Sequence, residues 1–582
     1  MIKNFSPIEK LVEESINYLY KLNPCPELDF QYNTKIYKGD LTLVLFPLSN
    51  ILKRSPKCIG IDIGSFVKNK LEELISFSII GGFLNFIYQD GYYLFLLRKM
   101  LNKNFYDLKL SDQKKVMIEY SSPNANKPLH LGHVRNSLIG YSISSIFKIV
   151  GYKIIKIQIM NDRGIHICKS MVAWNKLGKG EKPDSVGMKG DHFVGMYYHL
   201  FDKIYNEESK KYQENDIPIL KEAREMLKKW EDGDTKIRKI WKEMNEWVYK
   251  GFQDTYDKLG ITFDKIEYES NIYEIGKSII RYGLQKGFFF QKKDGSIWIN
   301  LIKDGFDQKL LLRSDGTSVY ITQDIGTAVM RFKKYRIDKL IYIVGKEQDY
   351  HFKVLFKILK RLGYIWVKKL IHLSYGMVYL PSGKMGSRKG NIIDADSFML
   401  EMFSLVKKNF LKKSFLSIKE KEKNAEIIGL GAIKYYFLQV NPKKNILFDP
   451  LKSIDFKGKT GTYIQYSYSR IRSIERKFII LCSLSNQNWL NDKLDINEKN
   501  IIKILKKYPF VLKKSAYELN PSLVANYIYE VAKTFNHLYQ NKKIIDPLNI
   551  IHSNICMNII HVTGNVLKSG MNLLGIQMLE RM

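Results

Sequence analysis

The stretch from Ile118 to Ile139, IEYSSPNANKPLHLGHVRNSLI, constrains the fold more than any other part of this chain. Residues 115–120 have the composition of a short buried strand, and the apolar residues after the stretch recur at helical spacing as far as Gly151. We expect a helix that begins near His130 or Leu131 and ends at this glycine. The next residues, KIIKIQIM, alternate as a second strand would. The pattern therefore predicts a strand–loop–helix–strand unit.

The loop of this unit is a candidate nucleotide site. In such a unit a ligand binds beyond the carboxyl end of the strand, where the N–H groups and the dipole of the helix favour phosphate. His130, Gly132 and His133 fall at that point. Gly132 allows close approach of a nucleotide, and two imidazoles can hydrogen-bond phosphate oxygens while charge moves during displacement at the α-phosphorus. Two histidines here can equally be capping or surface residues, so this motif alone does not decide the function.

A second loop, rich in glycine and lysine, lies later in the chain. PSGKMGSRKGN, at residues 381–391, follows the strand-like sequence LIHLSYGMVYL. Such a loop can close over a triphosphate, although in isolation it would be interpreted as a solvated charged hairpin. Strand and helix patterns alternate before it, which indicates parallel strands, and it stands at the end of a late strand of that series. This position makes its pairing with HLGH informative.

The two loops together resemble the signatures of a known enzyme family. SPNANKPLHLGH resembles the HIGH signature of class I aminoacyl-tRNA synthetases, PSGKMGSRKGN resembles their KMSKS loop, and the SSPN prefix is similar to that of the arginyl-tRNA synthetases. The resemblance extends over nearly the whole chain. It implies that the chain ligates L-arginine to its cognate tRNA in two steps, forming arginyl adenylate from ATP and then transferring arginine to the 3′-terminal adenosine. It also implies that tRNA is needed for the first step.

The resemblance assigns ATP to the two loops. The residues implied to bind it are His130, Gly132, His133, Lys384, Met385, Gly386 and Ser387. Gly386 replaces the usual serine, and Ser387 replaces the second lysine, which in many class I enzymes stabilises the departing pyrophosphate. Arginyl enzymes often lack that lysine, and a lysine shortly before the HIGH element is thought to replace it; Lys127 is favoured slightly over Lys389 for this role. The implied catalytic residues are His130, His133, Lys127, Lys384 and Lys389.

Binding of a free arginine requires acceptors around a planar cation with five N–H donors. Tyr320 and Asp324 of YITQD are four residues apart, so a helix that begins there presents both on one face. An acid at a helix N-terminus beside a core tyrosine fits the same pattern. The resemblance assigns guanidinium recognition to these two residues. The other positions that it places in the arginine pocket are Glu119, Asn124, His130 and Gln348.

We expect a multidomain α/β protein. The resemblance implies a Rossmann-like parallel-sheet catalytic domain at residues 113–397, split by an insertion at about 176–310. Residues 1–112 are expected to form a small α+β domain that contacts the tRNA, with strands over LTLVLFPL and NFIYQDGYYLFLL. Residues 398–450 are expected to form a helical connection, and residues 451–582 an all-α anticodon-binding bundle of the DALR type. In that bundle, Tyr463, Tyr466, Tyr468, Arg470 and Arg472 either stack on bases or belong to the core.

Composition adds limits on location and partners. The net charge of +34 suits a polyanionic partner, although the abundance of Lys, Ile and Asn also fits an A/T-biased genome. The start of the chain is amphipathic rather than signal-like, and no window holds about 18 uninterrupted apolar residues, so we expect a cytoplasmic protein without membrane contact. The expected partners are tRNA(Arg), L-arginine and ATP, with the chain acting as a monomer.

Metal chemistry is expected only through the nucleotide. The five cysteines are scattered without a CxxC pair, which argues against a zinc site or a disulfide framework. His166 and Cys168 are close in sequence, but two ligands without further partners indicate packing rather than metal. We therefore expect Mg²⁺ to accompany ATP, and no metal held by the protein itself.

Three alternatives remain open at this stage. A different class I synthetase is disfavoured by the short insertion and by the lack of Cys/His zinc spacing. A small-molecule nucleotidyltransferase shares HxGH but does not need a helical C-terminal bundle. A non-catalytic tRNA-binding protein is favoured only by Gly386 and Ser387, because both signature histidines and Asp324 are present.

Overall fold

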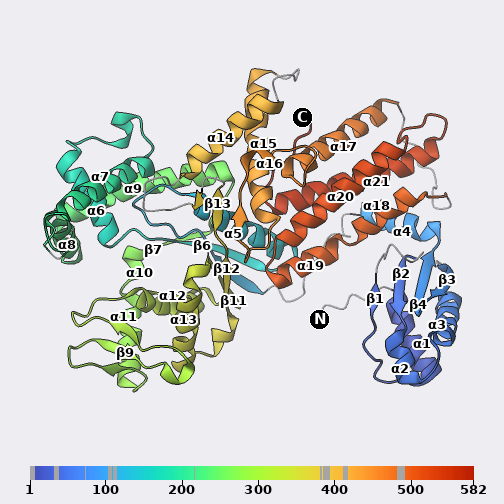
Figure 1. Ribbon diagram of the computed structural model, residues 1–582, viewed down its shortest axis with the longest axis horizontal. Helices are drawn as coiled ribbons and strands as arrows, with labels where there is room; N and C mark the ends of the chain where they lie inside the picture. The colour runs from blue at the N-terminus through green and yellow to red at the C-terminus, as the bar shows by residue number, and fades with distance from the viewer. Residues whose placement is uncertain are drawn as a thin grey trace. The chain divides into compact units, whose positions relative to one another are not determined.

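The computed structural model describes most of the chain in two compact units. The described residues are 7–31, 39–71, 74–102, 108, 114–214, 216–380, 383–384, 393–410, 417–481 and 492–582. One unit contains residues 1–106, 474–507 and 534–563, and the other contains residues 107–473, 508–533 and 564–582. Each unit therefore combines segments that are distant in sequence, as the mixed colours of Figure 1 also show.

The N-terminal residues form an antiparallel sheet with helices. The strands follow the order β1-β2-β4-β3 and every pair is antiparallel. The core of this region consists of side chains such as Leu43, Ile63 and Phe86, which are fully buried. The elements are α1 (Pro7–Tyr20), β1 (Phe30–Gln31), β2 (Leu41–Val44), α2 (Phe46–Leu52), α3 (Pro56–Lys70), β3 (Leu74–Ile80), β4 (Phe83–Tyr88) and α4 (Asp90–Leu101).

The two strands expected in this region are both shorter than predicted. The second ends at Tyr88, and YYLFLL belongs to helix α4, while the first gives way to α2 at Phe46. A continuous apolar run does not by itself distinguish a strand from a buried helix. Asp90 in the first turn of α4 and Arg98 and Lys99 in its last turn match the helix dipole, and this charge pattern is the signal that was overlooked.

The larger unit is built on a five-stranded parallel sheet. Its strand order is β12-β11-β5-β6-β7, and every neighbouring pair is parallel. The central strand β5 is buried on both faces, as a covered parallel sheet requires, with Val116, Met117 and Ile118 at most 1% exposed. The strands are β5 (Lys115–Glu119), β6 (Lys153–Met160), β7 (Lys265–Tyr268), β11 (Lys339–Gly345) and β12 (Leu370–Tyr375).

The connections of this sheet create a topological switch point at the carboxyl end of β5. Helix α5 (Leu131–Ile149) leads from β5 to β6 on one side, whereas β11 pairs with β5 on the other side. Ligands of open α/β sheets bind at such a topological switch point. The two helices next to β11, α12 (Tyr320–Tyr335) and α13 (Asp349–Arg361), share one hydrophobic core with the sheet (Figure 1). The predicted βαβ unit is thus confirmed.

The segment between β6 and α12 has two parts. Helices α6, α7, α8 and α9 pack together, green-blue at the left of Figure 1. Strand β7, although it lies inside the range expected for the insertion, forms the edge of the parallel sheet. The helices are α6 (Ile165–Leu177), α7 (Gly190–Glu208), α8 (Pro218–Glu231), α9 (Thr235–Leu259), α10 (Glu269–Ile272) and α11 (Ile275–Gln285). A small antiparallel sheet follows, with β8 (Phe290–Gln291), β9 (Ile297–Ile299) and β10 (Lys309–Leu312).

After β12 the chain enters a further small sheet and then becomes helical. Strand β13 (Val378–Leu380) pairs with β14 (Gly383–Lys384) and, in parallel, with β15 (Ile446–Leu447). The helices are α14 (Ala395–Phe410), α15 (Ile418–Leu438), α16 (Pro450–Ser453), α17 (Gly461–Leu481), α18 (Ile496–Lys506), α19 (Tyr508–Glu518), α20 (Ser522–Asn541) and α21 (Ile550–Leu573). Among the helices of the described residues, none has the length and apolarity needed to cross a membrane.

A buried arginine joins α5 to the segments around β13 and β15. The Arg135 guanidinium is fully buried and donates hydrogen bonds to the carbonyls of Gly376, Met377, Pro442 and Lys444. Burial lowers the pKa of Arg135 to about 10, which still leaves it charged at neutral pH. The helix that carries the HLGH motif is therefore held to the chain on both sides of the second signature loop.

Candidate active site

The two signature histidines cap helix α5. His130 is the N-cap residue, and its Nδ1 accepts the Gly132 N–H at 3.1 Å. The backbone N–H of His130 donates to Nδ1 of His133 at 3.2 Å, and the two rings stack at 3.9 Å. Because both Nδ1 atoms accept, each neutral ring carries its proton on Nε2. The pair therefore offers two N–H donors at a helix N-terminus, where anions bind.

The electrostatic surroundings keep both imidazoles neutral. Burial, with a contribution from the Lys127 charge, lowers the pKa of His130 to about 4. Burial also lowers the pKa of His133, and the neighbouring His130 and Lys127 add to the shift. At pH 7 these rings can donate hydrogen bonds to phosphate oxygens without acting as acids.

Gly132 and Lys127 complete this end of the site. A Cβ on Gly132 would lie 2.9 Å from Cε1 of His130, closer than van der Waals contact allows, so glycine is required for the ring to cover the helix terminus. Lys127 is half-buried, and within the described part of the chain its ammonium forms no ion pair or hydrogen bond. A lysine ammonium beside two N–H donors suits an incoming polyphosphate.

Helix α12 places the predicted guanidinium-binding pair at the same edge of the sheet. The helix begins at Tyr320, so Tyr320 and Asp324 lie one turn apart, as the sequence predicted. Tyr320 is 74% exposed. Oδ2 of Asp324 is 2.5 Å from Nε2 of His351, which lies in the first turn of α13. Gln348 is exposed in the turn just before α13, and Asn124 is exposed beside Asn161, with which it forms a backbone bridge.

Glu119 has a partner that the sequence did not reveal. Its Oε2 accepts a hydrogen bond from the Arg331 guanidinium, which is fully buried and also donates to Oε2 of Glu267 at 2.9 and 3.0 Å. Burial raises the pKa of Glu119, although the Arg331 charge opposes this shift. One oxygen of the predicted arginine ligand is thus already paired with an arginine of the protein itself.

Glu269 is a candidate that sequence analysis missed. It begins α10 directly after β7, is 8% exposed and accepts a hydrogen bond from Gln323 at 3.1 Å. Burial raises its pKa to about 7, and the charge of Asp324 adds to this shift. Glu269 therefore belongs to the same acidic surroundings as Asp324. The overlooked signal is that Glu269 directly follows the KIEY strand, but that short strand lay inside the expected insertion.

Within the second signature loop, residues 381–391, the structure describes Gly383 and Lys384. Gly383 and Lys384 form β14, whose backbone pairs with Tyr379 and Leu380. Met385, Gly386, Ser387 and Lys389 lie outside the described residues. Beyond the loop, Asp394 forms a backbone bridge with His130, and the Ala395 N–H donates to the Leu129 carbonyl at 2.8 Å. The chain leaving the second loop thus lies against the first loop, which brings the two signatures together.

Two of the five aromatic and basic residues considered for base binding in α17 share one carboxylate partner. Tyr468 is buried and donates to Glu580, and Arg472 pairs with the same carboxylate at 2.7 Å. Tyr466 remains 41% exposed, with the Arg470 guanidinium 4.9 Å from its ring centroid. The exposed side of α17 therefore offers Tyr466 with Arg470 as a stacking pair.

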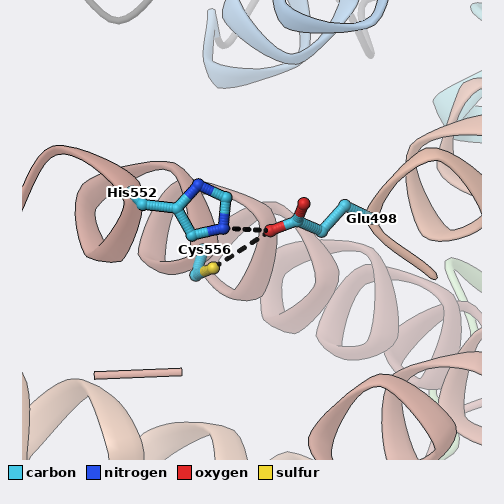
Figure 2. A group of neighbouring side chains, drawn as sticks. All are labelled: Glu498, His552 and Cys556. Atoms are coloured by element: carbon cyan, nitrogen blue, oxygen red, sulfur yellow. Dashed lines mark hydrogen bonds and ion pairs between the residues drawn. The ribbon is translucent and has the colours of Figure 1, made fainter. Parts of the chain in front are cut away.

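Two groups of side chains have the composition of a metal site. One consists of Glu498, His552 and Cys556, which face one another in Figure 2, and the other consists of Asp191, His192 and Asp396. Each group already holds a cation of the protein: Lys542 lies 2.7 Å from Oε1 of Glu498, and Lys189 lies 2.6 Å from Oδ2 of Asp396. Burial also raises the pKa of the Cys556 thiol, which disfavours the thiolate that a metal requires. These donor sets therefore fit internal ion pairs better than a bound metal.

Comparison with known proteins identifies the family. Residues 96–450 match the family described as tRNA synthetases class I (R), catalytic domain. The chain belongs to this family. Residues 464–582 of the synthetase match the DALR anticodon binding domain. The synthetase is 45% identical to an arginine–tRNA ligase of Bacteroides fragilis, with 99% of each chain covered, and 46% identical to one of Parabacteroides distasonis, with 96% of each covered.

Solved structures of low sequence identity support the same fold. The synthetase superimposes on the arginyl-tRNA synthetase of Thermus thermophilus with a TM-score of 0.80 at 21% identity, covering all of both chains. The arginyl-tRNA synthetase of Plasmodium falciparum gives a TM-score of 0.76, also at 21% identity, covering 99% of this chain and 98% of that one. The fold class predicted from the sequence, a class I parallel-sheet domain with a helical C-terminal part, is confirmed.

Proposed function

We propose that this synthetase attaches L-arginine to tRNA(Arg) through arginyl adenylate. In the first step, the α-carboxylate of arginine attacks the α-phosphorus of ATP and pyrophosphate departs. In the second step, the 2′-hydroxyl of the terminal adenosine of the tRNA attacks the adenylate. The observation that carries the proposal is the pair of neutral imidazoles at the N-terminus of α5, beside the Lys127 ammonium, which has no partner among the described residues. It has the donors and the charge that a nucleotide triphosphate needs.

The residues of this end of the site act by electrostatics and positioning. His130 and His133 donate hydrogen bonds to phosphate oxygens, and Gly132 permits close approach of the nucleotide. Lys127 and the loop that begins at Lys384 stabilise the charge that develops on pyrophosphate. Met385, Gly386, Ser387 and Lys389 belong to the same proposed ATP site through their place in the loop. Mg²⁺ enters with ATP, bound by phosphate oxygens and water rather than by a protein cage.

The guanidinium of arginine binds beside α12 in this proposal. Asp324 supplies the carboxylate and Tyr320 an aromatic surface, while Gln348 and Asn124 provide further polar groups at the rim. Glu119 and Glu267 together carry one more charge than their buried partner Arg331, and Glu119 contributes mainly through this net negative charge. Acidic surroundings favour arginine over neutral amino acids, because a neutral ligand leaves a carboxylate desolvated and unpaired.

The remaining parts of the chain bind tRNA in this proposal. Residues 451–582 recognise the anticodon, residues 1–112 contact the outer part of the tRNA, and residues 398–450 connect the catalytic domain of residues 113–397 to the bundle. The exposed Tyr466 and Arg470 are the first candidates for base contacts. The synthetase works in the cytoplasm as a monomer. The net charge of +34 predicts tRNA binding that weakens steeply with salt.

The decisive experiment is amino-acid-dependent exchange between ATP and pyrophosphate. It is run over all twenty amino acids with and without unfractionated tRNA. We expect exchange with arginine alone, and only when tRNA is present. Exchange with another amino acid would overturn the arginine pocket but keep the class, and no exchange under any condition would favour a non-catalytic tRNA-binding protein.

Two lysines compete to replace the second lysine of the KMSKS-type loop. If Lys127 has this role, Lys127→Ala slows arginine-dependent exchange by roughly 100-fold, whereas Lys389→Ala changes it by less than about 5-fold. Single-turnover formation of arginyl adenylate distinguishes the two variants. The reverse order would assign the role to Lys389.

A further inference from the structure

Helix α7 carries a buried cluster of charged groups that the proposed chemistry does not use. We call it the Lys189 cluster, after the lysine at its centre. The Lys189 ammonium lies 2.6 Å from Oδ2 of Asp396, 3.2 Å from Oδ2 of Asp191 and 2.5 Å from Oγ1 of Thr255. The side chains of Lys189 and Asp396 are only 18% and 12% exposed. The cluster consists of Lys189, Asp191, His192, Thr255 and Asp396.

This cluster joins two segments that are far apart in sequence. Asp191 and His192 lie in the first turn of α7, Thr255 lies in α9, and Asp396 lies in the first turn of α14. Nε2 of His192 is 3.3 Å from Oδ2 of Asp396 and 3.6 Å from Oδ1 of Asp394. The ion pair between Lys189 and Asp396 therefore holds the start of α14 to the helices of the insertion.

Close packing fixes α7 on both sides of the cluster. A Cβ on Gly251 would lie 2.4 Å from Oδ1 of Asp191, so α9 approaches α7 without intervening side chains. A Cβ on Gly195, farther along α7, would lie 2.7 Å from Cδ of Pro128. Pro128 stands two residues before His130, the first residue of the HLGH motif. Helix α7 thus touches the first signature loop directly and the residues after the second loop through Lys189.

The start of α14 in turn supports the HLGH motif. Asp394 forms a backbone bridge with His130, and the Ala395 N–H donates to the Leu129 carbonyl at 2.8 Å. Asp394 also accepts the N–H of Ser397 at 2.9 Å and its hydroxyl at 2.7 Å, which caps α14. Residues 394–396 are therefore the contact through which the cluster reaches His130.

The charges of the cluster keep this connection intact over a wide pH range. Burial acts to raise the pKa of Asp396, but hydrogen bonds from His192 and Lys189, with the charges of Lys189 and Lys258, outweigh it and hold this pKa well below its usual range. The hydrogen bond to Asp396 raises the pKa of His192. Asp396 thus stays ionised at neutral pH and can hold the Lys189 ammonium.

We propose that Lys189 and Asp396 are positioning residues for adenylate formation, which fix residues 394–396 against His130 and so hold the signature imidazoles in place for ATP. The expected effect on adenylate formation rests on the proposed function, whereas the contact between residues 394–396 and His130 does not. A displacement of about 1 Å at reacting groups can cost roughly 100-fold in rate, so loss of one ion pair beside His130 is expected to be measurable.

The test compares Lys189→Met and Asp396→Asn with two matched variants. Lys189→Arg retains the charge and tests rescue. Lys407→Met removes an ion pair from the same helix α14, 2.9 Å from Glu422, but both of its side chains are more than half exposed. We expect Lys189→Met and Asp396→Asn to lower kcat of ATP–pyrophosphate exchange by about 10- to 100-fold, with KM for arginine changed less than about 3-fold. The kcat of Lys189→Arg should be at least half of the wild-type value, and the kcat of Lys407→Met should equal the wild-type value.

Deuterium exchange measured by mass spectrometry gives a readout that does not depend on catalysis. Loss of the Lys189 pair should accelerate exchange in the peptide that contains Ala395, whose N–H donates to the Leu129 carbonyl, while helix α15 remains unchanged. Unchanged exchange in this peptide overturns the proposal, whatever the activity. A fall in kcat accompanied by faster exchange throughout the protein also overturns it, because the pair would then be only structural. If the wild type is inactive but the local acceleration is seen, the proposed function fails while the connection between Lys189 and His130 stands.

Discussion

Two groups of acidic side chains at the carboxyl edge of the sheet differ in the cation that they face. Glu119 and Glu267 are paired with Arg331, a fully buried guanidinium of the protein. Asp324 and Glu269 instead contact His351 and Gln323. The first group has its arginine built in, whereas no arginine of the described residues forms an ion pair with the second, although the charge of Arg163 acts on Glu269. Acidic residues that the sequence assigns to guanidinium binding are therefore not equally available to a substrate, because Glu119 already pairs with an arginine of the protein.

The largest effect should come from removing the internal cation. Arg331→Met leaves Glu119 and Glu267 buried without their partner, and we expect the free energy of unfolding to fall by about 3–5 kcal/mol. Urea denaturation followed by circular dichroism measures it. Arg361→Met is the matched control, because Arg361 pairs with Asp304 at a 34% exposed site and should cost no more than about 1 kcal/mol. Equal losses in the two variants would contradict the distinction.

The next effect should concern substrate rather than stability. Asp324→Asn keeps the shape of the side chain but removes the charge that faces arginine, so we expect kcat/KM for arginine to fall by roughly 100-fold, equivalent to about 3 kcal/mol. The affinity for tRNA should change little. Asp307→Asn, at a side chain that is 84% exposed, serves as the control. Unchanged arginine kinetics would remove Asp324 from the pocket.

Glu269 should show opposite effects on binding and on stability. Its pKa is raised to about 7, so it is protonated below that pH, and arginine affinity should increase as pH rises through 7. The free energy of unfolding of the free protein depends on pH in the opposite direction. In the unfolded chain the pKa of Glu269 is about 4.5. As pH rises from 4.5 to 7, this group therefore lowers the free energy of unfolding by up to about 3 kcal/mol.

Glu269→Gln separates these two consequences. At pH 8 it should raise the unfolding temperature of the free protein while weakening arginine binding by roughly 10-fold, and at pH 5 neither change should be large. Differential scanning fluorimetry and isothermal titration calorimetry at both pH values measure them. A variant that is destabilised at pH 8 would show that the carboxylate already has a cation in the free protein.

The smallest effect should come from Glu267→Gln. Arg331 keeps its pair with Glu119, so the fold is retained, but the buried group loses its net negative charge. We expect KM for arginine to increase only about 2-fold, since the charge acts at a distance. Steady-state pyrophosphate exchange measures it. A change as large as that of Asp324→Asn would mean that the two acidic groups act as one.

Local signals in the sequence predicted the elements on which the site is built. The helix after HLGH begins at Leu131 and ends at Ile149, and α12 begins at Tyr320, because capping residues and helical periodicity are encoded within a few neighbouring residues. The roles of the site residues and the four-part division of the chain remain predictions. The second signature loop lies largely outside the described residues, so its substitutions remain unexplained.

Contacts between distant segments were beyond prediction from the sequence. Glu119 and Arg331 are 212 residues apart, and nothing in either local pattern indicates that they meet. Strand β7 was not recognised because a four-residue strand with two charges takes its stability from pairing with β6 rather than from its own composition. The same reason explains why Glu269, at the end of that strand, was overlooked.

Arg135 has a consequence for the synthesis of the chain. Its carbonyl partner Lys444 follows it by 309 residues, and a ribosome adds about 5–20 residues per second. Roughly 15–60 s therefore pass between the synthesis of Arg135 and that of its last acceptor. Until then a charged side chain on α5 must remain hydrated, which opposes burial of that helix. An enzyme that supplies amino acids to the ribosome therefore completes the support of its own helix α5 late in translation, when 444 of its 582 residues have been made.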